Sequence, residues 1–316
     1  MHYTRRHLLA GAGGLVLAGI ASRPALAQVG SSKPLVIATG RFHGFLPSYQ
    51  LPERLKAAGV TVKVVEFPTA TERLEAVAAG YAQMSYAGLT ASTILRARGK
   101  DVVVVASTNE KGRALIGKAD IASVKDLKGR LIGVAFGSIE HITLIATLKQ
   151  AGLDPQNDVQ LINMPATDQP VAFSSKSIDA FMAFEPWATY GVRKFGGKVL
   201  TYPYETPVGA IDSGIETSEQ FIAENPRIVA AVVRAHIDAV KFYRGNLEAV
   251  ITEGVRNYKV PEDIMRASMD NIDLTYEIKQ NQISALANYL VELGFLKPDE
   301  FQRIDWSRFV NTTFLS

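Results

Sequence analysis

Two stretches of the chain, VTVKVVEFPTAT (residues 60–71) and DVQLINMPATD (residues 158–168), have the same construction. Each is an apolar run followed by a proline and then by polar residues typical of a helix start. The offset of 97 residues that superimposes the two prolines (165 − 68) also places Gly40 on Gly137. Each half of the chain thus reads as strand, glycine turn, helix, strand, proline-led helix and strand. We therefore expect two similar α/β lobes.

The first half alternates short apolar runs with helical patterns. The clearest helix is TERLEAVAAG (residues 71–80), preceded by Thr69, which forms a capping box with Glu72, and stopped by Gly80. Strands separated by helices predict a parallel sheet with helices on both faces. The expected strands of this half are 35–39, 60–67, 82–87 and 101–108.

The second half restarts with SVKDLKGRLIGVAFGS (residues 123–138), which predicts a capped helical turn, a break at Gly129 and a strand. A helix is expected at 140–152, a strand at 158–165, a helix-like stretch at 168–177 and a strand at 178–185. Asp168 is expected to cap the helix that follows Pro165.

After about Gly209 the pattern changes to successive amphipathic helices, at 217–257 and 261–293, and no long strand pattern follows. The clearest is PRIVAAVVRAHIDAVKFY (226–243), whose proline suits a first helical turn. We expect these helices to return and pack on the first lobe, which gives two α/β lobes and a helical tail.

The N-terminus resembles an export signal. Arg5 and Arg6 precede a moderate apolar run, and ALA follows at 25–27, which is the order of a secretory signal peptide of the twin-arginine (Tat) type. The alternative is an uncleaved membrane helix, but glycines interrupt the run and it is shorter than the ~20 apolar residues that a span needs. We expect residues 1–27 to be removed after Ala27 and the protein to be periplasmic.

Charge and cysteine content exclude several classes. The chain has 34 Lys and Arg and 31 Asp and Glu, and cleavage would remove Arg5, Arg6 and Arg23, so the net charge falls from +3 to 0 (3 − 3). A neutral chain argues against a nucleic-acid partner, because phosphate neutralisation needs a basic excess. The sequence has no cysteine, which excludes disulfides, a thiolate nucleophile and cysteine metal sites.

Catalytic motifs are absent from the sequence: we find no nucleophile elbow, HExxH motif or phosphate-binding P-loop. The histidines after the signal are His43, His141 and His236, and the last lies in the long helical pattern of the tail. We expect no enzyme activity, no cofactor and no metal site.

A ligand site is expected where strands give way to helices. Ligands of open α/β sheets bind beyond the carboxyl ends of the strands, where helix N-termini offer unpaired N–H groups. Four such turns, at 39–44, 87–92, 136–141 and 184–189, are predicted to face one crevice. The candidate ligand-binding residues in and beside them are Gly40, Arg41, Phe42, His43, Gly88, Leu89, Thr90, Gly137, Ser138, His141, Glu185 and Trp187.

Small and hydroxyl residues among the candidates have two interpretations. Gly40 and Gly137 would let the backbone approach a ligand, or they form ordinary tight turns. The hydroxyls of Thr90 and Ser138 would contact a ligand, or they cap their own helices.

The basic candidates also have two interpretations. Arg41 and His43 would pair with an anionic ligand, or they belong to a solvated loop. His141 would contact the ligand, or it is a surface or core residue.

The acidic and aromatic candidates are similarly open. Glu185 would accept a hydrogen bond from an amine or ring N–H of the ligand, or it binds a hinge residue. Phe42 and Trp187 would form walls of the site, or they belong to the core.

A family resemblance is carried by VKDLKGRLIGVAFGS (124–138), SIDAFMAFEPWA (177–188) and RIDWSRFVNTTFL (303–315). Together these segments resemble the substrate-binding proteins of ABC importers of the aliphatic-sulfonate, nitrate and taurine type, a family that includes thiamine-pyrimidine-binding proteins. The first loop, residues 39–55, is richer in aromatic and basic side chains than this resemblance leads us to expect, which leaves the ligand's identity open.

The resemblance implies a two-lobed type II periplasmic binding-protein fold, with the ligand cleft between the lobes and the helical C-terminal segment on lobe 1. We expect residues 34–115 plus 206–316 to form lobe 1 and residues 116–205 to form lobe 2. Hinge strands are expected near Leu115–Gly117 and Tyr202–Tyr204.

The resemblance also implies a function and partners. We expect a monomeric solute-binding component that captures a small organic anion, sulfonate-like, by hinge closure. It would deliver this ligand to a membrane permease served by a cytoplasmic ATPase. The alternative ligand is a flat nitrogen heterocycle of the thiamine-pyrimidine type, favoured by Phe42, Trp187 and Glu185. A pyrimidine-synthesis-like enzyme and a periplasmic sensor are less favoured alternatives.

Overall fold

The computed structural model describes residues 33–316. The expected signal peptide, residues 1–27, lies outside the described residues. Among residues 33–316, no helix combines the length and the apolar character that crossing a membrane requires.

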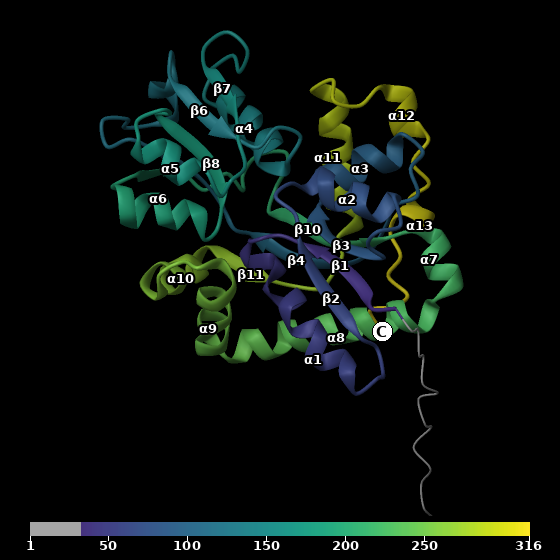
Figure 1. The fold of residues 1–316 in the computed structure, drawn as a ribbon. Helices are drawn as coiled ribbons and strands as arrows, with labels where there is room; N and C mark the ends of the chain where they lie inside the picture. The colour runs from purple at the N-terminus through teal and green to yellow at the C-terminus, as the bar shows by residue number, and fades with distance from the viewer. Residues whose placement is uncertain (1–32) are drawn as a thin grey trace, which may run out of the picture.

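Two separate β-sheets organise the chain, and they lie in different parts of the molecule (Figure 1). Sheet A has the strand order β11-β4-β10-β3-β1-β2 and sheet B the order β7-β6-β8-β5-β9. The strands of sheet A are β1 (Leu35–Thr39), β2 (Val62–Glu66), β3 (Met84–Gly88), β4 (Val103–Lys111), β10 (Ile211–Thr217) and β11 (Ile272–Leu274). The strands of sheet B are β5 (Arg113–Gly117), β6 (Leu131–Val134), β7 (Gln160–Asn163), β8 (Ala180–Phe184) and β9 (Lys198–Thr201).

The repeated sequence pattern corresponds to a repeated fold. Strand β1 lies between β3 and β2, parallel to both, and strand β6 lies between β8 and β7, also parallel to both. A helix follows the second strand of each trio and begins just after the echoed proline: α2 (Ala70–Ala78) and α5 (Gln169–Ser174). The expectation of two similar α/β lobes is confirmed, because both halves build the same three-strand parallel unit.

The prediction of a parallel sheet is correct for the three-strand units but not for the strands beside them. Strand β10 runs antiparallel to β3 and β4, and β5 runs antiparallel to β8 and β9. The sequence analysis also missed β10 and β11, because it expected no strand after Gly209. The reason is visible in β10, IDSGIET, which is mostly polar yet buried at all seven positions. Its polar side chains find internal partners; for example, Ser85 and Ser92 both donate to Glu216.

The chain crosses between the sheets twice. The first crossing is the single residue Gly112 between β4 and β5, whose φ of +84° suits glycine. The return lies between Thr201 of β9 and Ile211 of β10. The expected hinge strands lie beside these crossings: Leu115–Gly117 belongs to β5 of sheet B, and Tyr202–Tyr204 directly follows β9.

The fully buried Arg113 connects the two segments in which the chain crosses between the sheets. Arg113 donates from Nη1 to the carbonyl of Ile211 (2.7 Å) and to Oδ2 of Asp212 (2.9 Å), and from Nη2 to the carbonyl of Gly209 (2.7 Å). Arg113 begins β5, whereas its acceptors lie at the start of β10 and just before it, so the ion pair joins both connecting segments.

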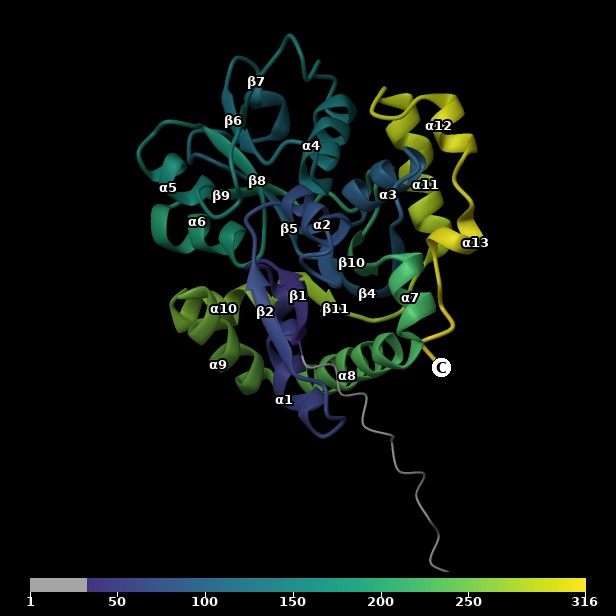
Figure 2. The ribbon, with the colours of Figure 1, turned by 45° about the vertical axis from the view of Figure 1, so that its right-hand side comes forward.

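Helices cover both faces of sheet A (Figures 1 and 2). One face packs on α1 (Leu51–Lys56) and the long α8 (Pro226–Gly245), in a core that includes Ile37 and Val232. The other face packs on α2, α3 (Leu89–Ala97) and α11 (Gln280–Glu292). Short helices near the C-terminus are α7 (Glu219–Glu224), α12 (Pro298–Gln302) and α13 (Trp306–Phe309).

The helical C-terminal segment therefore packs on sheet A, as expected, but part of it also reaches the other half. Helices α9 (Leu247–Tyr258) and α10 (Glu262–Ser268) share a core with α6 (Trp187–Phe195), which follows strand β8 of sheet B. The remaining elements are α4 (Ile139–Gln150) and the 3₁₀ helices η1 (His43–Gln50), η2 (Val124–Leu127) and η3 (Met269–Asn271).

Candidate functional site

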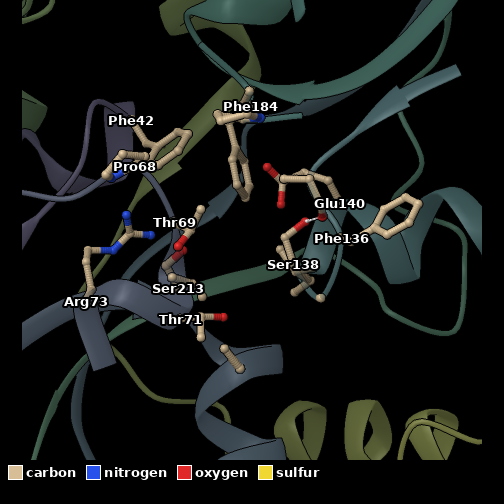
Figure 3. Close-up of a pocket in the computed structure, with 18 of the residues that line it drawn as sticks. Phe42, Pro68, Thr69, Thr71, Arg73, Phe136, Ser138, Glu140, Phe184 and Ser213 are labelled. Atoms are coloured by element: carbon tan, nitrogen blue, oxygen red, sulfur yellow. Dashed lines mark hydrogen bonds between the residues drawn. The ribbon is translucent and has the colours of Figure 1, made fainter. Parts of the chain in front are cut away.

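A cavity of about 280 Å³ lies at the carboxyl ends of strands from both sheets (Figure 3). Both echoed segments contribute to it, because Pro68–Thr71 and Met164–Ala166 line the cavity. This is where an α/β sheet is expected to hold a ligand, since the helices that follow the strands begin there. The remaining lining residues are Phe42, Phe45, Arg73, Gly88, Ala91, Ala135–Glu140, Asn163, Phe184 and Ser213.

The positive charge of the cavity comes from Arg73, which the sequence analysis did not single out. Its side chain is 3% exposed, Nη1 donates to the carbonyl of Phe67 (2.9 Å), and Nε has no hydrogen-bond partner among the described residues. The guanidinium lies 5.1 Å from the ring centroid of Phe45 and 5.7 Å from that of Phe42. Burial lowers the pKa of Arg73 to about 10, so the group stays protonated at neutral pH.

A neighbouring glycine explains how an arginine fits there. A Cβ added at Gly40 would lie 2.8 Å from Nη1 of Arg73, so any larger residue at this position would push the guanidinium away. Gly40 itself does not line the cavity. The sequence offered one signal for Arg73: it sits on the buried face of α2, beside Leu74 and Ala76, where an arginine is uncommon.

The acidic group of the cavity is Glu140, also missed by the sequence analysis. Its side chain is 1% exposed, and Oε2 has no hydrogen-bond partner among the described residues. Burial raises the pKa of Glu140 to about 8, while a hydrogen bond with Ser138 opposes the rise. Arg73 and Glu140 extend toward the cavity from α2 and α4, which belong to different halves of the chain (Figure 3).

Three helices begin at the cavity, and they differ in what occupies their N-termini. Helix α2 is capped by the predicted capping box of Thr69 and Glu72, which is confirmed. Helix α4 is capped by Ser138, whose hydroxyl accepts a hydrogen bond from the His141 N–H (3.3 Å). Helix α3 begins after Gly88 without a side-chain cap. Its first-turn N–H groups are therefore available to an anion.

Four of the twelve predicted site residues line the cavity: Phe42, Gly88, Gly137 and Ser138. Leu89 and Thr90 lie within α3, just past its N-cap, and are buried without lining the cavity. Thr90 does not cap its helix, and its hydroxyl has no partner among the described residues. Asp168 stands at the N-cap position of α5 but makes no capping hydrogen bond with its side chain.

The basic residues of the first loop lie away from the cavity. Arg41 is exposed and pairs with Glu66 (Nε to Oε2, 2.7 Å). His43 is fully buried, with Nε2 2.5 Å from the hydroxyl of Ser268 and its ring stacked on Tyr258. Burial lowers the pKa of His43 to about 3, so the ring is neutral.

The candidates Glu185 and Trp187 also have protein partners. Oε2 of Glu185 accepts from the Thr189 N–H (3.0 Å), and Oε1 accepts from Nδ2 of Asn271 (3.1 Å). Nε1 of Trp187 donates to the carbonyl of Arg41 (2.9 Å). Both residues thus join the two halves of the chain rather than line the cavity, although their part in binding stays a prediction.

The second histidine candidate, His141, lies behind an aromatic lining residue of the cavity. The ring of His141 stacks on Phe136, a lining residue, with centroids 4.7 Å apart, and meets the edge of Phe295. Burial lowers the pKa of His141 to about 4. Among the described residues, no cluster of side chains suits a metal ion.

Relatives with known names share most of the chain's length. It is 25% identical over 266 residues to a putative aliphatic sulfonates-binding protein of Escherichia coli, covering 81% of this chain and 82% of that protein. It is 27% identical over 216 residues to a taurine-binding periplasmic protein of the same organism, covering 67% of this chain and 64% of that protein.

Solved structures share the fold. The alkanesulfonate-binding protein SsuA of Xanthomonas axonopodis, bound to MOPS, superimposes with a TM-score of 0.76 at 18% identity, over 89% of this chain and 98% of that one. The expected two-lobed binding-protein fold is confirmed. The desulfurization enzyme DSZB has it too, with a TM-score of 0.66 at 15% identity over 90% of this chain and 97% of that one, so the architecture also serves an enzyme.

A protein-family model establishes the family of the chain better than any single relative does. The model described as "NMT1/THI5 like" matches residues 55–249, which is more than half of the 316 residues. The matched region includes α2 with Arg73, α4 with Glu140, and both crossings between the sheets. The chain therefore belongs to the NMT1/THI5-like family.

Proposed function

We propose that this protein is the extracytoplasmic solute-binding component of an ABC uptake system and that it captures a small organic anion of the sulfonate class. The observation that carries the proposal is the cavity, where the buried Arg73 and the uncapped N-terminus of α3 offer positive potential. The names of the sulfonate-binding relatives support the same ligand class.

Capture would proceed by closure of two lobes about the crossings at Gly112 and between β9 and β10. We assign residues 34–111 plus 206–316 to lobe 1 and residues 113–205 to lobe 2; the boundary expected after residue 115 is moved to Gly112, because strand β5 (Arg113–Gly117) pairs in sheet B. Arg73 then belongs to lobe 1 and Glu140 to lobe 2, so one ligand would contact both lobes and stabilise the closed form. The closed form would be read by a membrane permease with its cytoplasmic ATPase.

The proposal includes export and a monomeric state. The signal at residues 1–27 would direct the chain to the periplasm and be removed after Ala27. A binding role without catalysis agrees with the names of the relatives, and incubation of purified protein with bound ligand should return the ligand unchanged.

A flat nitrogen heterocycle is the second candidate ligand. Phe42, Phe136 and Phe184 line the cavity and could stack on a ring, and Glu140 could accept from a ring N–H. The same cavity would then bind pyrimidines better than sulfonates.

The decisive experiment is a binding screen with paired arginine variants. Purified protein is tested by calorimetry and thermal shift against alkanesulfonates, carboxylates and pyrimidines, and each ligand that binds is retested on Arg73→Gln and Arg41→Gln. We expect Arg73→Gln to weaken anion binding about tenfold or more, because a hydrogen bond to a charged group contributes ~1.5–3 kcal/mol. Arg41→Gln is the matched control, because Arg41 is exposed and bonded to Glu66.

Three results would contradict the proposal. Anion affinity that survives Arg73→Gln would remove the main observation. Scattering profiles that do not contract on ligand addition would argue against lobe closure. Tight pyrimidine binding with no anion binding would favour the second candidate.

A further inference from the structure

The cavity contains an acidic group that binding of a simple anion does not use. Glu140 is 1% exposed and lines the cavity, and its Oε2 is without a partner among the described residues. Buried carboxyl groups are normally paired or hydrogen-bonded, because a buried polar atom without a partner has lost its hydration and gained nothing in return. In Figure 3 its carboxyl group points into the space between Phe184 and Ser138.

The charged groups around Glu140 leave it without a counter-ion. Arg113 is the cation that lowers its pKa from nearby, but its guanidinium is bound to Asp212 and to two backbone carbonyls. Asp212 raises the pKa of Glu140 further. Arg73 interacts with Glu140 electrostatically but forms no direct ion pair with it among the described residues. The neighbouring His141 is neutral, because burial lowers its pKa to about 4.

The position of Glu140 makes the two sides of the cavity electrostatically different. It is the second residue of α4, so its carboxyl group stands at the positive end of that helix. An anionic ligand group placed there would meet this carboxyl group. The ligand's anion is therefore better accommodated on the other side, by Arg73 and the uncapped end of α3.

We propose that Glu140 is a specificity-determining residue that binds a protonated amine of the ligand, so that the captured molecule carries an anionic group at one end and an ammonium group at the other. This inference rests on the proposed function. The two unlike ends of the ligand would each bind a different lobe, the anionic group at Arg73 and the ammonium group at Glu140. The buried guanidinium and the buried carboxyl group would each gain a partner in one step.

The test compares ligands that differ only in the amine. The dissociation constants of 2-aminoethanesulfonate and 3-aminopropanesulfonate are measured against those of ethanesulfonate and propanesulfonate, for the wild type, Glu140→Gln and Arg73→Gln. We expect the wild type to prefer the amino compounds about tenfold or more and Glu140→Gln to lose most of that preference, because an ionised acceptor is replaced by a neutral one. Arg73→Gln should weaken both kinds of ligand alike.

The outcomes separate the two proposals. A wild type that binds both kinds equally, with a ratio unchanged by Glu140→Gln, overturns this inference and leaves the proposed function standing. A wild type that binds none of the sulfonates, with or without the amine, overturns both. A circular dichroism spectrum and a cooperative thermal transition like those of the wild type would show that Glu140→Gln is folded.

A second measurement needs no variant. At pH 7 the free protein holds Glu140 mostly protonated, since burial raises its pKa to about 8, and an ammonium group beside it would favour the carboxylate. Binding of an amino compound should therefore release a large part of one proton, seen as a heat that changes with the ionisation enthalpy of the buffer. Proton release that is equal for an amino compound and for ethanesulfonate would overturn the inference.

Discussion

The burial of Glu140 predicts an unusual dependence of stability on pH. Its pKa is raised from the ordinary 4.5 to about 8 in the folded protein, with desolvation as the main cause. Between these two values the folded state holds one proton that the unfolded state has lost, so this group's contribution is fully present below pH 4.5 and is lost as pH rises through 8. One pKa unit corresponds to ~1.4 kcal/mol, which gives a loss of roughly 4 kcal/mol between pH 5 and pH 9.

Replacing Glu140 with glutamine isolates this contribution, because the amide keeps the shape and does not ionise. The free energy of unfolding is measured by denaturant titration of wild type and variant at pH 5, 7 and 9. We expect similar stabilities at pH 5 and a variant that is more stable at pH 9 by several kcal/mol. The raised pKa of Glu185 affects both proteins equally and cancels in the difference.

The matched control is Glu224→Gln at an exposed position, which should shift the difference little at any of these pH values. A stability difference between wild type and Glu140→Gln that stays constant from pH 5 to pH 9 would refute the reasoning. It would mean that water or a counter-ion reaches Glu140 in the free protein.

Two further substitutions test a buried ion pair and a close packing contact outside the cavity. Asp212→Ala should cost about 3–5 kcal/mol in denaturant unfolding, because it leaves Arg113 buried without its carboxylate partner; a loss below ~1 kcal/mol would indicate that water replaces the carboxylate. Gly44→Ala should cost about 1–3 kcal/mol and lower the Tm, because its Cβ would lie 2.0 Å from Oδ1 of Asn109. Gly245→Ala, whose Cβ meets nothing within 4 Å, is its control and should be neutral or slightly stabilising; equal Tm values for the two variants would contradict the clash.

Local signals in the sequence predicted most elements of the two halves. The capping box at Thr69 and Glu72, the break at Gly129 and the helix after Ser138 are all found where expected. These features depend on groups only a few residues apart, so the sequence alone contains their physical cause. The strand β10 was missed because polar residues become strand core only when distant partners satisfy them.

The position of the cavity was predicted better than the residues that line it. The turns around Phe42, Gly88 and Ser138 do meet at one cavity, because the carboxyl ends of parallel strands lie at the same edge of a sheet. The side chain of His43, however, contacts Ser268, which is 225 residues away in the chain, and therefore does not line the cavity. Sequence spacing carries no information about such a contact.

The sequence by itself determined the repeated α/β unit, since prolines, glycines and helix caps act through backbone geometry within a few residues. Only the tertiary structure decided which charged groups face the cavity. Arg73 is accommodated because Gly40 leaves room for it, and Glu140 is buried without a counter-ion because Arg113 is already bound to Asp212. Burial and pairing of charges depend on neighbours from remote parts of the chain, and these neighbours are brought together only by folding.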